Sequence, residues 1–345
     1  MDFCYENGGE ALALTDHGNM NGLAYQVLHA KKMQEAGKDF KPIFGCEAYF
    51  IPSIEDWREE YTKAMEDKKR ARAVKKDAAS GATVEDEGAS KKTQDILRRR
   101  RHLVLLAQNQ TGLNNLFKLV SESYKAENFY RYPRIDYALL EKYNEGIIAA
   151  SACLGGVYAG NYWENREDSP EAVLGAMRET TKRMVDIFGD RWYAEVQWNN
   201  IKEQHELNQY VIQVAQELGV RLITTADSHY PNPTAWKDRE LYKRLVWLGK
   251  GRPSWADEES QLPDGVEEIG YELYPKNGDQ VWNSYKQYSD SCGFEYDDDV
   301  IMQSIEETHR IAFDRIENFL PDNTCLLYTS PSPRDATLSR MPSSA

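Results

Sequence analysis

Short apolar runs alternate with longer amphipathic segments along most of this chain. The pattern predicts strands at 11–15, 42–50, 103–107, 146–150, 192–196 and 221–225, and helices at 21–37, 111–126, 170–188 and 203–218. Thr111 is the expected capping residue of the second helix, and Gly37 the expected stop of the first. This alternation predicts an α/β fold with a mostly parallel sheet, either a barrel or a doubly wound sheet.

Four segments depart from the alternation. Residues 53–101 are densely charged and predict a surface insertion, partly helical and partly disordered, for which a solvated role is favoured over a DNA-contacting arm. Residues 249–270 are rich in Gly, Pro and acidic residues and are typical of a linker, and residues 279–320 are helical again, as at the start of a second domain. Residues 325–345 lack periodicity and resemble a translated sequencing adapter, so a non-native tail is favoured over a genuine disordered one.

Composition narrows the class of protein. The chain has 345 residues, 41% of them hydrophobic, and a net charge of −14, which argues against a generic nucleic-acid binder while leaving a local basic groove or bridging divalent cations open. No run of 18 apolar residues and no apolar signal core occur, so the expected location is the cytoplasm. The five cysteines lack paired CxxC spacing, which argues against a disulfide framework or a structural zinc knuckle.

Aspartate–histidine pairs follow the first and the last predicted strands. Asp16 and His17 come directly after the first strand, where His17 could bind a metal and Asp16 could accept the ring N–H of a histidine. Asp227 and His229 are two positions apart, so an extended backbone directs both to the same side, as a metal chelate requires. Taken alone, the first pair could be an ordinary turn and the second a capping aspartate with a hydrogen-bonded histidine.

Three further residues have metal-binding chemistry near predicted strands. Glu47 lies in an apolar run, where a buried carboxylate needs a cation, a hydrogen-bond partner or exposure. Cys153 follows a strand and could be a metal thiolate or a small core residue, whereas Cys46 is expected to pack in the core. His102 precedes its strand and fits the same edge only if that strand runs in the opposite direction or is offset.

One multinuclear metal site would explain all of these residues together. Two metal ions roughly 3.5–4 Å apart can polarise a phosphate, generate hydroxide and stabilise the leaving oxygen. The remaining histidines, His29, His205 and His309, lie within helical patterns and are expected to be solvated or packed.

Five segments in this order resemble the motifs of the PHP (polymerase and histidinol phosphatase) domain, in the form found in bacterial DNA polymerase III alpha subunits: 11–20, 42–49, 101–106, 150–155 and 227–230, supported by 114–121 and 132–134. The resemblance implies an α/β, distorted (β/α)7 TIM-like barrel, here expected to lack its first strand and to carry a charged insertion and a helical C-terminal extension. It divides the chain into a PHP domain at 1–250, a linker and the start of the polymerase palm at 251–324, and the adapter-derived tail at 325–345.

The resemblance also implies a set of metal ligands. The family's site has nine ligand positions, and the motifs place six of them at His17, Glu47, His102, Cys153, Asp227 and His229. Asp16 is the implied supporting residue behind them, and Asp227, His229 and His17 are the implied catalytic residues. The implied cofactors are divalent metals in a multinuclear site, Zn²⁺ or Mn²⁺, with Mg²⁺ as a third candidate.

The implied function is that of an N-terminal fragment of a replicative DNA polymerase, with a metal-dependent phosphoesterase or 3′–5′ proofreading exonuclease site. The implied partners are DNA and replisome subunits such as the sliding clamp and the proofreading subunit, with no membrane. The chain is expected to be truncated at its front and to lack the polymerase aspartates, so these 345 residues alone are expected to be inactive and to bind metal weakly. The alternatives are a stand-alone PHP phosphatase acting on a small phosphomonoester and a catalytically inactive scaffold.

Overall fold

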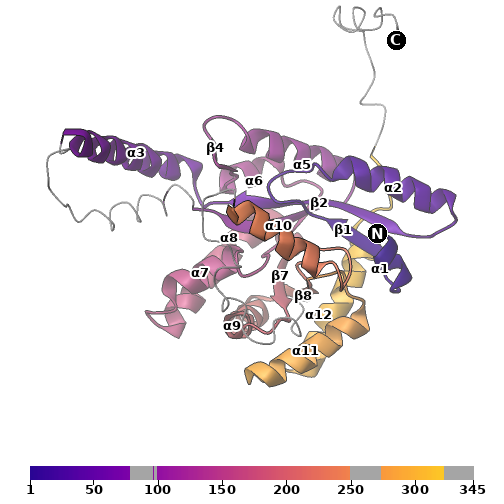
Figure 1. The fold of residues 1–345 in the computed structure, drawn as a ribbon. Helices are drawn as coiled ribbons and strands as arrows, with labels where there is room; N and C mark the ends of the chain where they lie inside the picture. Colours follow the sequence, from indigo (N-terminus) through magenta and orange to yellow (C-terminus); the bar gives the residue numbers. More distant parts are fainter. Residues whose placement is uncertain (78–95, 97–98, 249–272, 322–345) are drawn as a thin grey trace, which may run out of the picture.

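A curled six-stranded sheet forms the centre of the molecule in a computed structural model that describes residues 1–77, 96, 99–248 and 273–321 (Figure 1). Its order is β1-β2-β3-β6-β7-β8, the same as the order along the chain. The strands are β1 (Ala11–Leu14), β2 (Lys41–Phe50), β3 (Arg101–Ala107), β6 (Ile147–Ala150), β7 (Trp192–Gln197) and β8 (Arg221–Thr225). A doubly wound sheet would reverse its order part-way, so the arrangement is that of a half-barrel.

The direction of β3 is the main departure from the predicted sheet. The pairs β1–β2, β6–β7 and β7–β8 are parallel, as expected, but β3 is antiparallel to both β2 and β6. The mixed α/β architecture that the sequence predicted is confirmed, and the curled sheet is consistent with the implied barrel. The described residues supply six strands of this sheet, and the (β/α)7 count of the barrel stays a prediction.

Amphipathic helices cover the outer face of the sheet. These are α2 (Leu23–Glu35), α5 (Gln110–Ser123), α8 (Pro170–Phe188) and α9 (Lys202–Leu218), whose apolar sides share one core with outward residues such as Phe44, Leu105 and Ala194. The helix predicted to begin at Thr111 is capped instead by Asn109, whose side chain accepts a hydrogen bond from the backbone N–H of Gly112. Asn109 has extended backbone geometry, which a capping residue requires.

Shorter elements connect and flank these layers: α1 (Asp2–Glu6), β4 (Phe129–Tyr130), β5 (Tyr132–Pro133), α6 (Tyr137–Tyr143), α7 (Val157–Asn165), η1 (Gly189–Arg191) and α10 (Trp236–Leu248). Helix α3 (Ile54–Asp77) projects away from the sheet (Figure 1), which confirms the helical part of the predicted insertion. The predicted disorder in that insertion, the linker at 249–270 and the tail at 325–345 fall largely or wholly outside the described residues.

The inner face of the sheet has an apolar floor. Alternate strand residues, including Ile43, Ile148 and Ile223, pack there against Ile311 and Ile316. These two residues lie near the end of a helical segment that follows residue 277. That segment consists of α11 (Gly278–Cys292), α12 (Asp298–Arg310) and the π-helical turn η2 (Ile311–Arg315). It therefore packs on the same cores as the sheet, and a domain boundary near residue 250 stays a prediction.

Candidate metal centre

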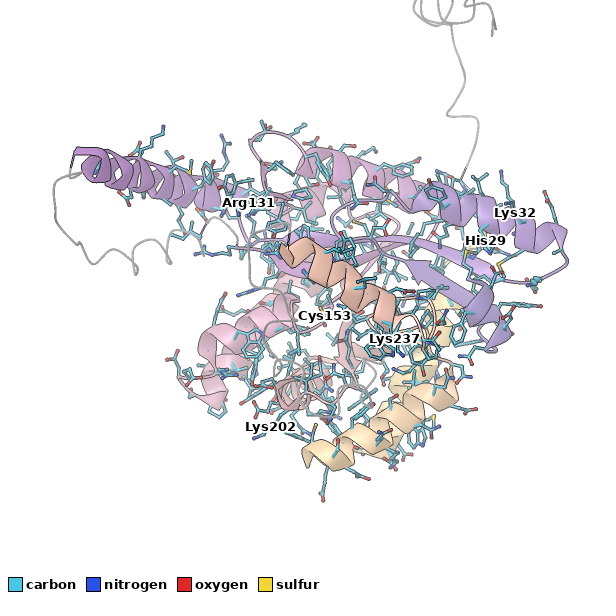
Figure 2. All side chains as sticks on the ribbon, in the orientation of Figure 1. His29, Lys32, Arg131, Cys153, Lys202 and Lys237 are labelled. Carbon is cyan, nitrogen blue, oxygen red and sulfur yellow. The ribbon has the colours of Figure 1, made fainter. Side chains whose placement is uncertain are left out.

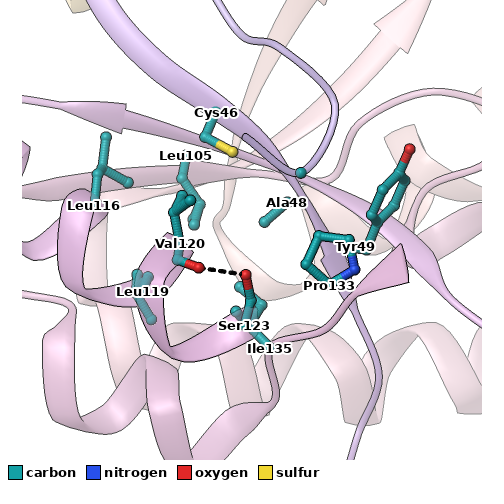
Figure 3. Close-up of a pocket in the computed structure, with 11 residues that line it drawn as sticks. Cys46, Ala48, Tyr49, Leu105, Leu116, Leu119, Val120, Ser123, Pro133 and Ile135 are labelled. Carbon is teal, nitrogen blue, oxygen red and sulfur yellow. Dashed lines mark hydrogen bonds between the residues drawn. The ribbon is translucent and has the colours of Figure 1, made fainter. Parts of the chain in front are cut away.

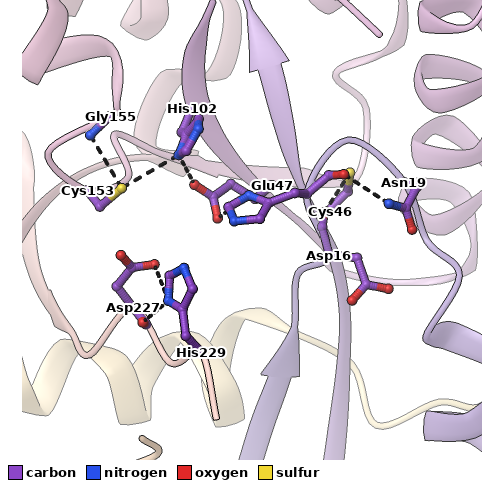
Figure 4. Close-up of polar contacts among 10 residues, drawn as sticks. Asp16, Asn19, Cys46, Glu47, His102, Cys153, Gly155, Asp227 and His229 are labelled. Atoms are coloured by element: carbon purple, nitrogen blue, oxygen red, sulfur yellow. Dashed lines mark hydrogen bonds and ion pairs between the residues drawn. The ribbon is translucent and has the colours of Figure 1, made fainter. Parts of the chain in front are cut away.

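Three side chains converge on the inner face of the sheet, and Figure 4 shows two of them, Glu47 and His102, side by side. His17 follows β1 and forms an isolated parallel bridge with Glu47 of β2, and His102 is the second residue of β3. One potential ligand atom from each of these three residues lies within 4.8 Å of the other two. Two imidazoles and a carboxylate at this spacing are a donor set suited to a divalent metal ion.

Glu47 is the buried centre of this group. Its Oε1 lies 2.6 Å from His102 Nδ1 and its Oε2 lies 3.3 Å from His17 Nδ1, while its side chain is only 7% exposed. Burial alone would raise the pKa of Glu47, but the hydrogen bond and charge of His102, together with the charges of His17 and His229, outweigh burial and hold the pKa below its usual value. Burial has the dominant effect on His17 and lowers its pKa, which favours the neutral ring that a metal ligand needs.

The reversed direction of β3 accounts for the position of His102. Because β3 is antiparallel to β2, its first residues lie beside the carboxyl-terminal half of β2, with His102 paired to Tyr49 and Val104 paired to Glu47. The beginning of β3 therefore meets the same edge as the ends of β1 and β2. The sequence alone did not determine whether His102 lies at this edge, and the direction of β3 determines that it does.

Cys153 lies beside His102, with Sγ 3.6 Å from His102 Nδ1. The thiol is positioned by a tight loop in which Ala152 has a φ of 63° and the N–H of Gly155 donates to Sγ at 3.4 Å. Burial, together with the charges of Asp227 and Glu47, raises the pKa of Cys153. A thiolate at this position therefore requires a bound cation to stabilise it.

Asp227 and His229 close the opposite side of the group, just beyond β8 (Figure 4). Asp227 has a φ of 47°, a left-handed conformation that is uncommon outside glycine and occurs at functional sites. His229 Nδ1 lies 2.7 Å from the backbone oxygen of Asp227, and its ring centroid lies 5.8 Å from that of His17. Burial raises the pKa of Asp227, with a further contribution from the charge of Glu47.

Asp16 and Cys46 face neighbouring structure. The Oδ2 atom of Asp16 accepts a hydrogen bond from the backbone N–H of Gly22 at 2.7 Å, at the start of α2, so its described contact is to backbone rather than to a histidine ring. Cys46 is buried, as core packing predicts, and burial raises its pKa to about 12.

A small cavity lies near this site but cannot hold a substrate. It is lined by Cys46 and Leu105 of the sheet and by Leu116, Leu119 and Ser123 of α5 (Figure 3). Ser123 Oγ donates to the backbone oxygen of Val120 at 2.7 Å, so this polar group is satisfied within its own helix. The cavity volume is about 10 Å³, the space of one water molecule.

Glu195 is a polar residue of this region that sequence reasoning missed. It lies in β7 with relative exposure of 6%, and burial, reinforced by the charges of Glu47 and Asp227, raises its pKa to about 8. The detectable signal was a carboxylate inside the apolar run 192–196, the same signal that singled out Glu47.

The three remaining histidines have other partners. His29 pairs with Asp2 at 2.8 Å, His205 is buried between Asn199 and Tyr296, and His309 is exposed beside Glu10. Figure 2 places His29 on the periphery of the molecule and Cys153 towards its middle. The expectation that these histidines are packed or solvated is confirmed.

Comparison with known proteins identifies the family. The family model described as "PHP domain" matches residues 1–199, more than half of the chain. The chain belongs to the PHP domain family. The matched range contains four of the six implied PHP ligands, namely His17, Glu47, His102 and Cys153.

Several curated relatives share this PHP region, and each is named DNA polymerase III subunit alpha. The chain is 39% identical over 243 residues to the protein from Aquifex aeolicus and 36% identical over 241 residues to that from Borreliella burgdorferi, in each case over 70% of this chain and 17% of the relative. The Deinococcus radiodurans protein is 35% identical over 220 residues, 64% of this chain and 13% of the relative. The chain therefore spans only about a sixth of the length of the relatives it matches. Within the part that the structure describes, no helix is long and apolar enough to cross a membrane.

Proposed function

We propose that His17, Glu47 and His102 are the centre of a divalent metal site that Cys153, Asp227 and His229 complete. The observation that carries the proposal is the spacing of the first three, whose ligand atoms lie within 4.8 Å of one another. The second observation is the buried carboxylate of Glu47, which has only histidine rings as ion-pair partners among the described residues. Imidazole, carboxylate and thiolate donors together suit Zn²⁺ or Mn²⁺, with Mg²⁺ a weaker match because it prefers oxygen donors alone.

The exposure of the side chains distinguishes residues that face the substrate from residues that only hold the metal. His17 is 43% exposed, His229 27% and Asp227 23%, whereas Glu47 is 7% exposed. A substrate therefore approaches from the side of His17, Asp227 and His229, which are the proposed catalytic residues, while Glu47 and His102 hold the buried side. Bound divalent metals supply polarisation of a phosphate oxygen and activation of water at this position.

The proposed reaction is hydrolysis of a phosphodiester at the 3′ end of a DNA strand. Water adds to the phosphorus, the bond from phosphorus to the 3′ oxygen breaks, and a 5′-mononucleotide leaves. His17, His229 and Asp227 would orient the phosphate at the exposed side of the site and accept or return a proton there.

The proposed parent is a replicative DNA polymerase III alpha subunit, a DNA-directed DNA polymerase. The support is the name shared by the curated relatives, at 35–39% identity across three bacterial lineages. In that parent, DNA, the sliding clamp and a proofreading subunit are the proposed partners, and the cytoplasm is the proposed location. A stand-alone phosphatase is less well supported, since these relatives are far longer than the region they share with this chain.

The test uses the chain and a version extended by its native flanking sequence. Each is incubated with single-stranded DNA labelled at its 5′ end and with Mn²⁺ or Zn²⁺, and shortening from the 3′ end is followed on a gel. A His229→Ala variant should lose the activity, whereas His29→Ala, which alters a histidine on α2 away from the site, should retain it. Equal activity in the His229→Ala variant rejects this site as the source of the nuclease. No activity in the extended protein with stoichiometric metal bound rejects the nuclease and favours a scaffold.

A further inference from the structure

Glu195 has a buried carboxylate oxygen for which the described part of the chain supplies no partner. Oε2 is buried and makes no hydrogen bond to any described residue, and the residue as a whole is 6% exposed. The backbone N–H of Ala152 favours the ionised form of the carboxylate, whereas burial disfavours it more strongly. Within the described part of the chain, Glu195 forms no ion pair, although an uncompensated carboxylate is costly to bury.

The strand register places this carboxylate on the inner face with the metal site. Trp192, Ala194 and Val196 of β7 pack in the outer core, while Tyr193 packs on the inner floor. Side chains alternate between the two faces along a strand, so Glu195, two residues after Tyr193, points to the same inner face. It lies two positions further towards the strand end, above the apolar floor.

The neighbours of Glu195 belong to the site. Glu47 and Asp227 lie close enough for their charges to act on its carboxylate, and its own charge acts on the Cys153 thiol. A hydrogen bond also connects β7 to the loop that carries Cys153, because the backbone N–H of Glu195 donates to Ser151 Oγ at 2.9 Å. Three carboxylates and a thiol thus gather around a few histidines, which leaves an excess of negative charge once the acids ionise.

We propose that Glu195 is an additional carboxylate ligand of the metal site, binding a divalent cation through Oε2 either directly or through one bound water. The inference rests on the proposed metal site but not on the nuclease activity. It assigns a metal-binding role to β7, a strand to which none of the six residues implied by the family motifs belongs. Two divalent cations would balance the three carboxylates and one thiolate, which explains why an acid with no cationic side chain beside it stands at this position.

The test measures metal binding rather than activity. The full chain, its Glu195→Gln variant and a Glu307→Gln control are dialysed against graded Zn²⁺ concentrations from micromolar to millimolar, and bound zinc is counted by elemental analysis. Glu307 matches Glu195 in exposure, at 6%, but its partners are Arg221 and Arg310. Glu195→Gln should weaken zinc binding by roughly 10–100-fold, and Glu307→Gln should leave it unchanged.

The outcomes separate this inference from the proposed function. Unchanged zinc affinity and stoichiometry in Glu195→Gln overturns the inference and leaves the six-residue site standing. Weakened zinc binding in Glu195→Gln, together with an absence of nuclease activity in the metal-loaded extended protein, supports the inference and rejects the nuclease. Absence of zinc binding by the wild-type chain over the whole range overturns the ligand assignments of both.

A measurement on the unaltered protein tests the inference even if the Glu195→Gln variant fails to fold. A zinc-loaded crystal, with the metals located by anomalous scattering, shows whether Oε2 of Glu195 lies about 2.0–2.2 Å from an ion, as a direct carboxylate ligand does. A single water bridging Oε2 to the ion also supports the proposal. An ion with neither contact overturns it.

Discussion

The carboxylate of Glu47 lies 2.6 Å from Nδ1 of His102, and the two residues come from neighbouring strands that run in opposite directions. This relationship joins the middle of β2 to the beginning of β3 at a single edge of the sheet. It holds Glu47 ionised in a position where only 7% of its side chain is exposed. The contact therefore keeps the Glu47 carboxylate negatively charged on the buried side of the proposed metal site.

Removing that charge should weaken metal binding. A Glu47→Gln variant keeps the shape of the side chain but loses the anionic donor, so its affinity for Mn²⁺ or Zn²⁺ should fall by more than the roughly tenfold that loss of a supporting residue causes. Equilibrium dialysis with elemental analysis measures the change. Glu55→Gln, at an exposed position near the start of α3, should bind metal as the wild type does. Equal affinity in Glu47→Gln would remove this residue from the ligand set.

Stability of the metal-free protein should depend on pH through Glu195. Its folded-state pKa of about 8 lies above the ordinary value of 4.5, so the native state retains a proton that the unfolded chain releases. The stabilising contribution is complete below about pH 4.5 and is lost as the pH rises through about 8. The loss has a limiting slope of about 1.4 kcal/mol per pH unit for one proton.

The measurement for this prediction is urea unfolding with a chelator present, at several pH values between about 5 and 8. Glu195→Gln should lack this part of the decline, so its free energy of unfolding should exceed that of the wild type increasingly towards pH 8. Asp227 and His17 also titrate differently in the folded state, but they are present in both proteins and cancel in the difference. Parallel curves for the two proteins would show that Glu195 is ordinarily ionised.

Lys41 should contribute to the attachment of the helical C-terminal segment. Its buried ammonium group donates to the backbone oxygens of Ala312, at 2.5 Å, and of Ile316. Lys41→Met leaves both carbonyls without this donor, which should cost about 1–3 kcal/mol of unfolding free energy. Chemical denaturation measures the loss, and Lys32→Met at an exposed position on α2 is the control. Equal destabilisation by the two substitutions would contradict a specific role for Lys41.

Two glycine substitutions should have opposite effects on stability. A Cβ added to Gly112 in α5 would lie 1.9 Å from the backbone oxygen of Gly146, so Gly112→Ala forces two backbone segments apart. Gly175 lies within α8 with nothing within 4 Å of an added Cβ, so Gly175→Ala should stabilise the protein by roughly 0.5–1 kcal/mol through helix propensity alone. Thermal unfolding of both variants checks the pair: the midpoint should fall for Gly112→Ala and rise for Gly175→Ala.

The sequence by itself determined the elements and most of the chemistry of the site. Apolar alternation along strands and amphipathic periodicity along helices are local properties, and the strands predicted around Ala13, Phe44 and Ile223 are present. His17, Glu47 and Cys153 stood out because a polar or reactive residue beside an apolar run needs a physical reason. The order of the motifs then indicated the PHP family, which the comparison confirms.

Only the tertiary structure decided which of these residues meet. The direction of β3 depends on its neighbours and not on its own sequence, so the place of His102 could not be derived from residues 101–107 alone. The choice of Asn109 over Thr111 as the helix cap depends on the backbone conformation at that turn. Glu195 looked like one acid within an apolar strand. It becomes a candidate ligand because β7 pairs with β8, which Asp227 follows, and because the charges of Glu47 and Asp227 act on its carboxylate.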